Sequence, residues 1–351
     1  MKSLLKNQLF WAGLVLVALI VVVLLNNQSA SIGYSNGRLT GPIIDLFIFV
    51  PPILMISLGM TLVIATSGID LSVGSVMAVS GAVAMQFLLN SGNANSVGAA
   101  AGAAGLALMV GLAIGAFSGF LVSVIKLQPF ITTLIMMLAG RGIANMITGG
   151  KNAAGNSATF NWISQGRVFG FPVGFLIALA ILLAVVLLVR KTALGMSIES
   201  VGINPRAAEM AGIRSGRILF MVYALSGLLA AAAGIFAVAY IGTVEVSSSG
   251  TGSGMEMDAI LAVVIGGTSL AGGKFNLAGT TLGAFIITAL NQVVVYLGVS
   301  SAAVPAFKAM VIIFISILQS DRIVGWFSSF DKAGKNTDKP KGSASPKEVP
   351  A

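Results

Sequence analysis

Two charged side chains stand inside apolar segments of the sequence, where a charge is costly. Asp70 lies between PPILMISLGMTLVIA (51–65) and the apolar run 76–89, and Arg141 lies well inside the apolar stretch 129–148. An ionisable residue within a membrane-spanning segment is by default a candidate for a functional site. The chemistry open to such groups is ion or proton relay, contact with a polar substrate, or the bracing of one helix against another.

The composition excludes several other kinds of chemistry. The chain of 351 residues contains no cysteine and no histidine, so it offers no thiol nucleophile, no Cys- or His-based metal site and no histidine-dependent triad. Lys274 does not complete a phosphate loop, because Thr268 stands at the first glycine position of that pattern and Phe275 follows the lysine. We therefore expect no catalytic residue, no metal and no cofactor bound by this chain.

The balance of residue types points to a membrane protein. Only 9% of the residues are charged and 56% are hydrophobic, whereas a soluble domain carries about 25% charged residues. Apolar runs of roughly 20 residues recur, the length of helix that crosses a bilayer. The sequence predicts an all-α polytopic membrane protein with about ten transmembrane helices, some of them short or broken, over 9–25, 43–66, 70–89, 99–125, 129–148, 172–190, 217–241, 257–270, 276–298 and 303–320.

The basic residues predict the orientation. With ten spans, one side of the membrane receives most of the lysines and arginines, and the positive-inside rule makes that side cytoplasmic and places both termini there. The net charge of +9 then reflects cytoplasmic loops and anionic lipid headgroups rather than affinity for nucleic acid. We expect a cytoplasmic N-terminus (1–8), one transmembrane permease domain (9–327) with a cytoplasmic segment at 191–216, and a polar tail (328–351) that is disordered.

Two glycine-containing interruptions separate apolar runs. GIDLSVGS (68–75) and GTSLAGGK (267–274) align as G-x-x-L-x-x-G, and interrupted hydrophobic segments in corresponding positions are typical of transporter pathways. In a chain with 43 glycines the likeness can also be coincidence. The pathway candidates from these breaks are Gly68, Asp70, Ser72, Gly74, Gly267, Ser269, Gly272 and Gly273, together with Arg141. In the first break, Gly68 and Gly74 are expected to permit the turn.

The charges have structural explanations that compete with a role in transport. Asp70 can be the N-cap of a helix that starts near Leu71, and Arg141 can pin helices through carbonyl groups or a carboxylate. Glu256 and Asp258 open a short span, where acidic side chains complement the helix dipole. The candidate partners of Arg141 are Asp70, Glu256 and Asp258.

The segment RKTALGMSIESVGINPRAAEMAGIRSGR (190–217) carries the clearest local signal. Asn204 can cap a helix, Pro205 fits its first position and Gly212 fits the residue past its end. The pattern predicts a two-turn helix over 205–211 between two spans, rigid and small enough to seat in a partner's cleft. An ordinary loop is the alternative. Elsewhere, Gly111, Gly115 and Gly119 predict close packing of helices in lipid.

At this point the chain resembles the permease subunits of bacterial ABC sugar importers of the ribose, xylose and galactofuranose type. The resemblance is carried by TLVIATSGIDLSVGSVMAVSGA (61–82), LQPFITTLIMMLAGRGIA (127–144), RKTALGMSIESVGINPRAAEMAGI (190–213) and DAILAVVIGGTSLAGGKFNLAGTTLGA (258–284). These stretches recur in order and extend over most of the chain from Pro51 to Gln319. The galactofuranose-type members look most similar.

The resemblance implies half of a transport pathway in the bacterial inner membrane. A cytoplasmic ABC ATPase would bind ATP and magnesium and dock on 195–213, a periplasmic sugar-binding protein would deliver the sugar, and a second permease, identical or related, would complete the pathway. The residues implied in docking are Gly195, Glu199, Gly202, Asn204, Pro205, Ala207, Ala208 and Gly212.

Direct contact with the sugar is harder to place. An uncharged sugar needs amide and hydroxyl partners, for which the candidates are Asn145, Asn291, Gln292 and Tyr296. The rival interpretation is an ion-coupled secondary transporter in which Asp70 and Arg141 form the relay. A membrane scaffold without transport activity is the third.

Overall fold

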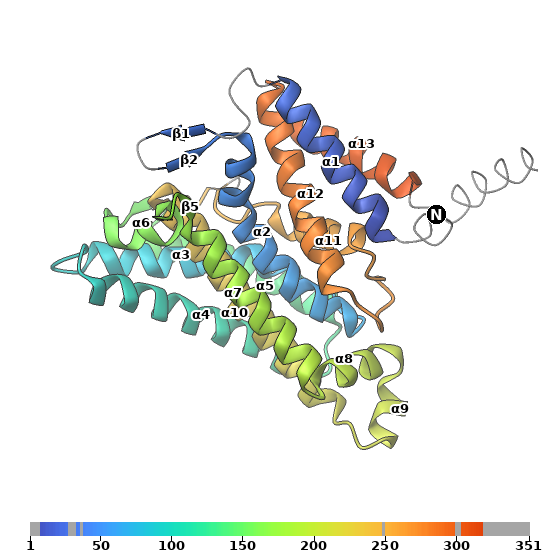
Figure 1. Ribbon diagram of the computed structural model, residues 1–351. Coiled ribbons are helices and arrows are strands. Elements are labelled where there is room, and N and C mark those ends of the chain that lie inside the picture. The colour runs from blue at the N-terminus through green and yellow to red at the C-terminus, as the bar shows by residue number, and fades with distance from the viewer. Residues whose placement is uncertain (1–7, 27–32, 36–37, 248–249, 299–302, 319–351) are drawn as a thin grey trace, which may run out of the picture.

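A computed structural model describes residues 8–26, 33–35, 38–247, 250–298 and 303–318, and this part of the chain is predominantly helical (Figure 1). The predicted tail 328–351 and nearly all of the predicted segment 1–8 lie outside the described residues. The elements in chain order are α1 (Gln8–Asn26), β1 (Gly33–Ser35), β2 (Arg38–Thr40), α2 (Pro42–Ala65), α3 (Val73–Leu89), α4 (Val97–Ser123), α5 (Pro129–Thr148), β3 (Ala153–Ala154), α6 (Ala158–Gln165), β4 (Arg167–Val168), β5 (Phe171–Pro172), α7 (Val173–Lys191), α8 (Leu194–Ile203), α9 (Pro205–Met210), α10 (Ser215–Ile241), β6 (Thr243–Val244), α11 (Met255–Ile265), α12 (Leu277–Tyr296) and α13 (Val304–Leu318).

Each of the ten predicted spans coincides with a helix. Within the described residues, six helices are long and apolar enough to cross a membrane: α2, α4, α5, α7, α10 and α12. The chain is therefore a polytopic membrane protein, while the count of ten crossings and the side on which the termini lie stay predictions. Helix α11 has 11 residues and ends at Ile265, five residues before the predicted end of its span.

Helix α2 occupies the centre of the bundle. Its side chains are apolar on all sides, and nearly all of them from Ile53 to Ala65 are fully buried, as expected for a helix surrounded by other helices. It packs against α10, α12 and α11. Pro51 and Pro52 stand inside it, so the carbonyls of Phe47 and Ile48 lack their helical N–H donors.

Helices α4 and α10 pack closely along much of their length, and small residues line the contact. A methyl group on Gly115 would lie 2.5 Å from the carbonyl oxygen of Tyr223, and one on Gly119 would lie 2.9 Å from that of Phe220. Gly111 and Gly227 also face each other with no room for a side chain. The predicted packing face of α4 is confirmed, and it explains how backbones approach without a hydrophobic driving force between them.

The bundle has two distinct ends (Figure 1). One end carries three two-stranded antiparallel ribbons, with Tyr34 opposite Leu39, Ala153 opposite Val244 and Val168 opposite Phe171, together with the short helix α6. At the other end α8 and α9 project beyond α7 (Figure 1). The basic segment 190–217 and the loop that contains Lys274 meet at this second end, which agrees with the charge asymmetry used to predict the orientation.

The α4–α10 contact can be tested with one methyl group. Gly115→Ala should lower the free energy of unfolding by about 1–3 kcal/mol, because the added group overlaps backbone atoms that cannot move aside. Gly105→Ala on the same helix is the matched control, because no heavy atom lies within 4 Å of its added methyl. Thermal unfolding of the purified chains in detergent measures the difference. Equal midpoints for the two variants would contradict the close packing.

Candidate functional site

The first break lies between α2 and α3, and a Schellman motif ends α2. The N–H of Gly68 donates to the carbonyl of Val63 (3.1 Å), and the N–H of Ser67 donates to that of Ile64 (2.8 Å). These two hydrogen bonds define the motif, in which the residue just past the C-cap adopts a left-handed conformation. That residue is Ser67, at φ +62°, and not the predicted Gly68.

The second break, between α11 and α12, is closed in the same way. The N–H of Thr268 donates to the carbonyl of Val263 (3.2 Å), and the N–H of Gly267 donates to that of Val264 (2.9 Å). Gly267 is left-handed, at φ +85°. The geometry supports an internal echo but corrects its register by one residue, because Gly267 corresponds to Ser67 rather than to Gly68. The alignment of glycine with glycine was wrong, since a serine holds the left-handed position in the first copy.

Of the other glycines predicted at the breaks, Gly68 and Gly74 allow close contacts, and Gly272 and Gly273 adopt left-handed backbone conformations. A methyl group on Gly68 would lie 2.6 Å from the hydroxyl of Tyr223, and one on Gly74 would overlap the carboxylate of Glu256 and the carbonyl of Gly252. Gly74 lies within α3 and permits the loop before α11 to approach, so its predicted part in the turn was wrong. Gly272 and Gly273 are both left-handed, at φ +85° and +88°.

Asp70 is held by hydroxyl groups and one backbone amide. Its Oδ1 accepts from the N–H (3.0 Å) and the hydroxyl (2.6 Å) of Ser72, and its Oδ2 accepts from the hydroxyl of Ser226 on α10 (2.8 Å). The N-cap position of α3 belongs to Ser72, so Asp70 was wrongly assigned as the cap. It still satisfies an amide at the start of the helix and ties the break to α10.

Arg141 contacts the loop before α11. Its Nη1 donates to the carbonyl of Thr251 (2.8 Å), and Glu256 is the carboxylate that acts on it electrostatically. Of its predicted partners, only Glu256 is therefore its neighbour. Ser269 accepts the N–H of Ala271 (3.2 Å) and stabilises the second break.

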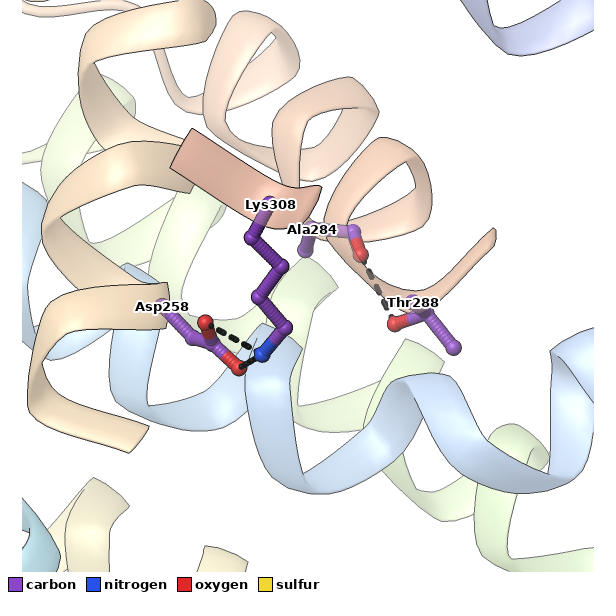
Figure 2. A network of polar contacts seen from close by, with 4 residues as sticks. All are labelled: Asp258, Ala284, Thr288 and Lys308. Atoms are coloured by element: carbon purple, nitrogen blue, oxygen red, sulfur yellow. Dashed lines mark hydrogen bonds and ion pairs between the residues drawn. The ribbon is translucent and has the colours of Figure 1, made fainter. Parts of the chain in front are cut away.

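Asp258 has a partner that the sequence analysis missed. The ammonium of Lys308 on α13 lies 3.0 and 2.9 Å from its two carboxylate oxygens (Figure 2). The pair is largely buried and joins α11 to α13. Asp258 is also in the first turn of α11, as predicted. A lysine within an apolar run was itself a signal, because such a residue almost always has a buried partner.

The segment between α7 and α10 forms the predicted capped helix. The Oδ1 of Asn204 accepts from the amides of Arg206 (3.1 Å) and Ala207 (3.2 Å). The far end closes through Gly212, left-handed at φ +85°, and α9 ends at Met210, one residue before the predicted Ala211. Both predicted caps are confirmed.

The side chains of this segment divide into an inner and an outer set. Gly195, Gly202 and Ala208 are buried within the chain, and Glu199 is half-buried. Asn204, Pro205, Ala207 and Gly212 are exposed, as are three larger apolar residues: Met196, Ile203 and Met210, at 71%, 72% and 85%. The outer set presents an apolar surface in a segment that lies outside the bundle.

A junction joins this segment to both breaks. The hydroxyl of Ser67 lies 2.8 Å from the carbonyl oxygen of Gly202 and 2.9 Å from that of Ala271, and the N–H of Gly273 donates to the carbonyl of Ala65 (2.9 Å). We call Ala65, Ser67, Gly202, Ala271 and Gly273 the junction. It connects the end of α2, the end of α8 and the loop after α11 by hydrogen bonds.

The four predicted sugar contacts do not converge. Asn145 lies on α5 and donates to the carbonyl of Arg141 (3.2 Å). Gln292 and Tyr296 lie on α12, where Gln292 is buried beside α1 and α2 and Tyr296 donates to Asp45 (3.1 Å). Asn291 is half-buried on the same helix. These residues do not form a single sugar site within this chain.

Interrupted helices tied to a capped helix outside the bundle define a subunit of a membrane transporter. The chain belongs to the family described as branched-chain amino acid transport system / permease component, which matches residues 43–318. No solved structure gave a significant match.

Three relatives are similar over most of their length. The fructose import permease protein FruF of Bifidobacterium longum is 49% identical, covering 92% of this chain and 90% of the relative. The galactofuranose transporter permease protein YtfT of Escherichia coli is 42% identical, covering 92% and 93%. The ribose import permease protein RbsC of Escherichia coli is 42% identical, covering 76% and 82%.

The junction can be tested at Gly202. Gly202→Ala should lower the free energy of unfolding by about 1–3 kcal/mol, because its methyl group would overlap the carbonyl oxygen of Ala65 and crowd the N–H of Gly273. Gly142→Ala is the control, since no heavy atom lies within 4 Å of its added methyl. The measurement is thermal unfolding in detergent, combined with limited proteolysis of 191–216. A Gly202→Ala chain as stable and as protected as the control would show that the junction is not close-packed.

Proposed function

We propose that this chain is the permease subunit of an ATP-driven ABC importer that moves a monosaccharide across the bacterial inner membrane. The observation that carries the proposal is its similarity, over nine-tenths of its length, to permeases named for the import of fructose and of galactofuranose. ATP hydrolysis belongs to a separate ATPase subunit, and this chain supplies the path and the mechanical link. We retain ten spans with both termini in the cytoplasm as part of the proposal.

The sugar is a hexose in this proposal. The relatives named for fructose and galactofuranose align over a larger share of the chain than the relative named for ribose. The sequence motifs favoured a galactofuranose-type permease, and fructose is now an equally supported candidate for the sugar. Because the candidate contacts within one chain do not converge, the path is proposed to form between two permeases, with most of the selectivity residing in the periplasmic binding protein.

The docking surface for the ATPase is proposed to be the outer set of the segment between α7 and α10. Met196, Ile203 and Met210 are exposed there, and the cores of protein interfaces are enriched in methionine and depleted of charged residues. Ala208 is among the residues that the resemblance implies in docking, but its side chain is only 4% exposed. A change at Ala208 would disturb the fold of α9 itself, so Met210 is the better position.

The transmission of force follows from the junction. ATPase movement would displace α9 and α8, and the carbonyl of Gly202 lies against Ser67. The loop after α11 hydrogen-bonds the end of α2 at the same place. Two helix breaks would therefore respond together to one input, which is what alternation between outward- and inward-facing states requires.

The ion-coupled alternative needs Asp70 and Arg141 to act as a relay. Among the described residues these two side chains form no hydrogen bond or ion pair with each other, and each has a separate partner in Ser226 and Thr251. Their contacts favour bracing over relay.

Transport in a reconstituted system decides between the two mechanisms. Proteoliposomes should contain this permease, its ATPase and its binding protein, each labelled sugar being tested in turn: fructose, galactofuranose and ribose. We expect uptake that requires ATP and persists when ionophores collapse the ion gradients. Uptake by the permease alone, abolished by ionophores and independent of ATP, would establish the secondary transporter instead.

Docking has its own test. Met210→Asp should weaken the binding of the ATPase at least tenfold, because it places a charge in the apolar centre of the proposed contact. Val97→Asp is the control, because Val97 is an exposed apolar residue at the start of α4, where an aspartate complements the helix dipole. Affinity is measured between purified permease and ATPase. If Met210→Asp binds as tightly as Val97→Asp, the docking surface lies elsewhere.

A further inference from the structure

A cavity of about 980 Å³ opens where α4 ends and α10 begins. Its walls come from the last turn of α4, the first two turns of α10, the end of α9 and the loop that joins α9 to α10. Of the residues assigned to docking above, Gly212 lies at its edge, and no role has been given to the cavity itself. The lining residues that matter here are Phe120, Val124, Glu209, Arg214, Arg217, Phe220 and Met221.

The charge of the cavity is predominantly positive. Arg214 and Arg217 are both exposed, and neither forms an ion pair or a side-chain hydrogen bond with another described residue. Glu209 is the single acidic residue of the lining. Two guanidinium groups placed in this way can bind a phosphate through several charge-assisted hydrogen bonds.

The other wall is apolar and is exposed at the surface of the bundle. Val124 and Met221 are 62% and 52% exposed, and Phe120 and Phe220 are 43% and 39% exposed. Both helices are long and apolar enough to cross a membrane. Since Met221 follows Arg217 by four residues, slightly more than one helical turn, a rise of about 6 Å separates the charged level from the apolar level.

We propose that this cavity binds an anionic phospholipid. The phosphate would lie against Arg214 and Arg217, and an acyl chain would cover the apolar wall formed by the ends of α4 and α10. A cavity that is basic at the membrane boundary and apolar one turn deeper matches the two parts of such a molecule, and basic pockets between spanning helices bind acidic lipid headgroups elsewhere.

Free phosphate and a protein partner fit this cavity less well. Free phosphate would leave the apolar wall uncovered. A soluble protein would have to reach side chains that lie a turn inside two spanning helices. The lipid site would also bear on docking, because Glu209, on the helix proposed to receive the ATPase, lines the same cavity.

The test measures lipid binding to the full-length chain by native mass spectrometry. Phosphatidylglycerol and phosphatidylcholine with the same acyl chains are titrated against the parent and against Arg214→Gln/Arg217→Gln. We expect the parent to prefer phosphatidylglycerol and the double variant to lose about tenfold or more of that affinity. Arg190→Gln/Lys191→Gln removes two adjacent basic residues at the end of α7, outside the cavity, and should change binding less than twofold.

Further variants separate charge from shape and from folding. Arg214→Lys/Arg217→Lys should retain the preference, Glu209→Gln should strengthen it, and Val124→Trp should weaken binding by filling the cavity without altering its charge. Each chain is first checked by its elution profile and thermal midpoint. If an arginine variant fails to fold, Val124→Trp and the competition below still test the proposal.

Several results would overturn it. Equal losses in the two glutamine pairs would show general attraction between a basic surface and acidic lipid. Displacement of phosphatidylglycerol from the parent by millimolar inorganic phosphate would show a simple anion site. Loss of bound lipid on addition of the ATPase, together with loss of ATPase binding in the Arg214→Gln/Arg217→Gln chain, would show that the cavity belongs to the protein interface.

Discussion

The backbone at the end of α2 lies within hydrogen-bonding distance of two other segments, and the proposed path of coupling from the docking segment to the helix breaks depends on this contact. Ser67 reaches the carbonyl of Gly202, and Ala65 receives the amide of Gly273. Although Ser67 is exposed, its hydroxyl and the amide of Gly273 both have partners inside the chain. The two breaks are therefore not isolated features, because each is hydrogen-bonded to the other at this place.

The elements that depend on local chemistry could be predicted from the sequence. Asn204, Pro205 and Gly212 each satisfy a rule that involves a few neighbouring residues, and the structure confirms the helix that they bound. The apolar spans follow from hydropathy alone. The two breaks were also recognised, although their register was off by one residue. A search for glycine at the left-handed position misses Ser67. The energetic cost of its left-handed backbone is compensated by hydrogen bonds from its hydroxyl to Gly202 and Ala271.

The contacts that depend on tertiary structure could not be predicted in this way. Ala208 was among the residues implied in docking but is buried. The sequence could not show this, because a helix of six residues gives no periodicity from which to assign a face. Asp70 was placed near the start of α3, yet its bond to Ser226 joins positions 156 residues apart. Lys308 and Asp258 are likewise distant in sequence. Residues that line a path between two subunits are harder still, since one chain holds only half of that path.

The two prolines inside α2 have a consequence for how the central helix can deform. Removing two successive backbone donors leaves the helix held by fewer hydrogen bonds at that level, and sharp helix kinks occur mainly at such positions. Bending stress in α2 will thus concentrate near Pro51 rather than spread along its length. The part of α2 that ends at Ala65 leads to the junction, so a bend at the prolines would move the junction relative to the part of α2 that begins at Pro42.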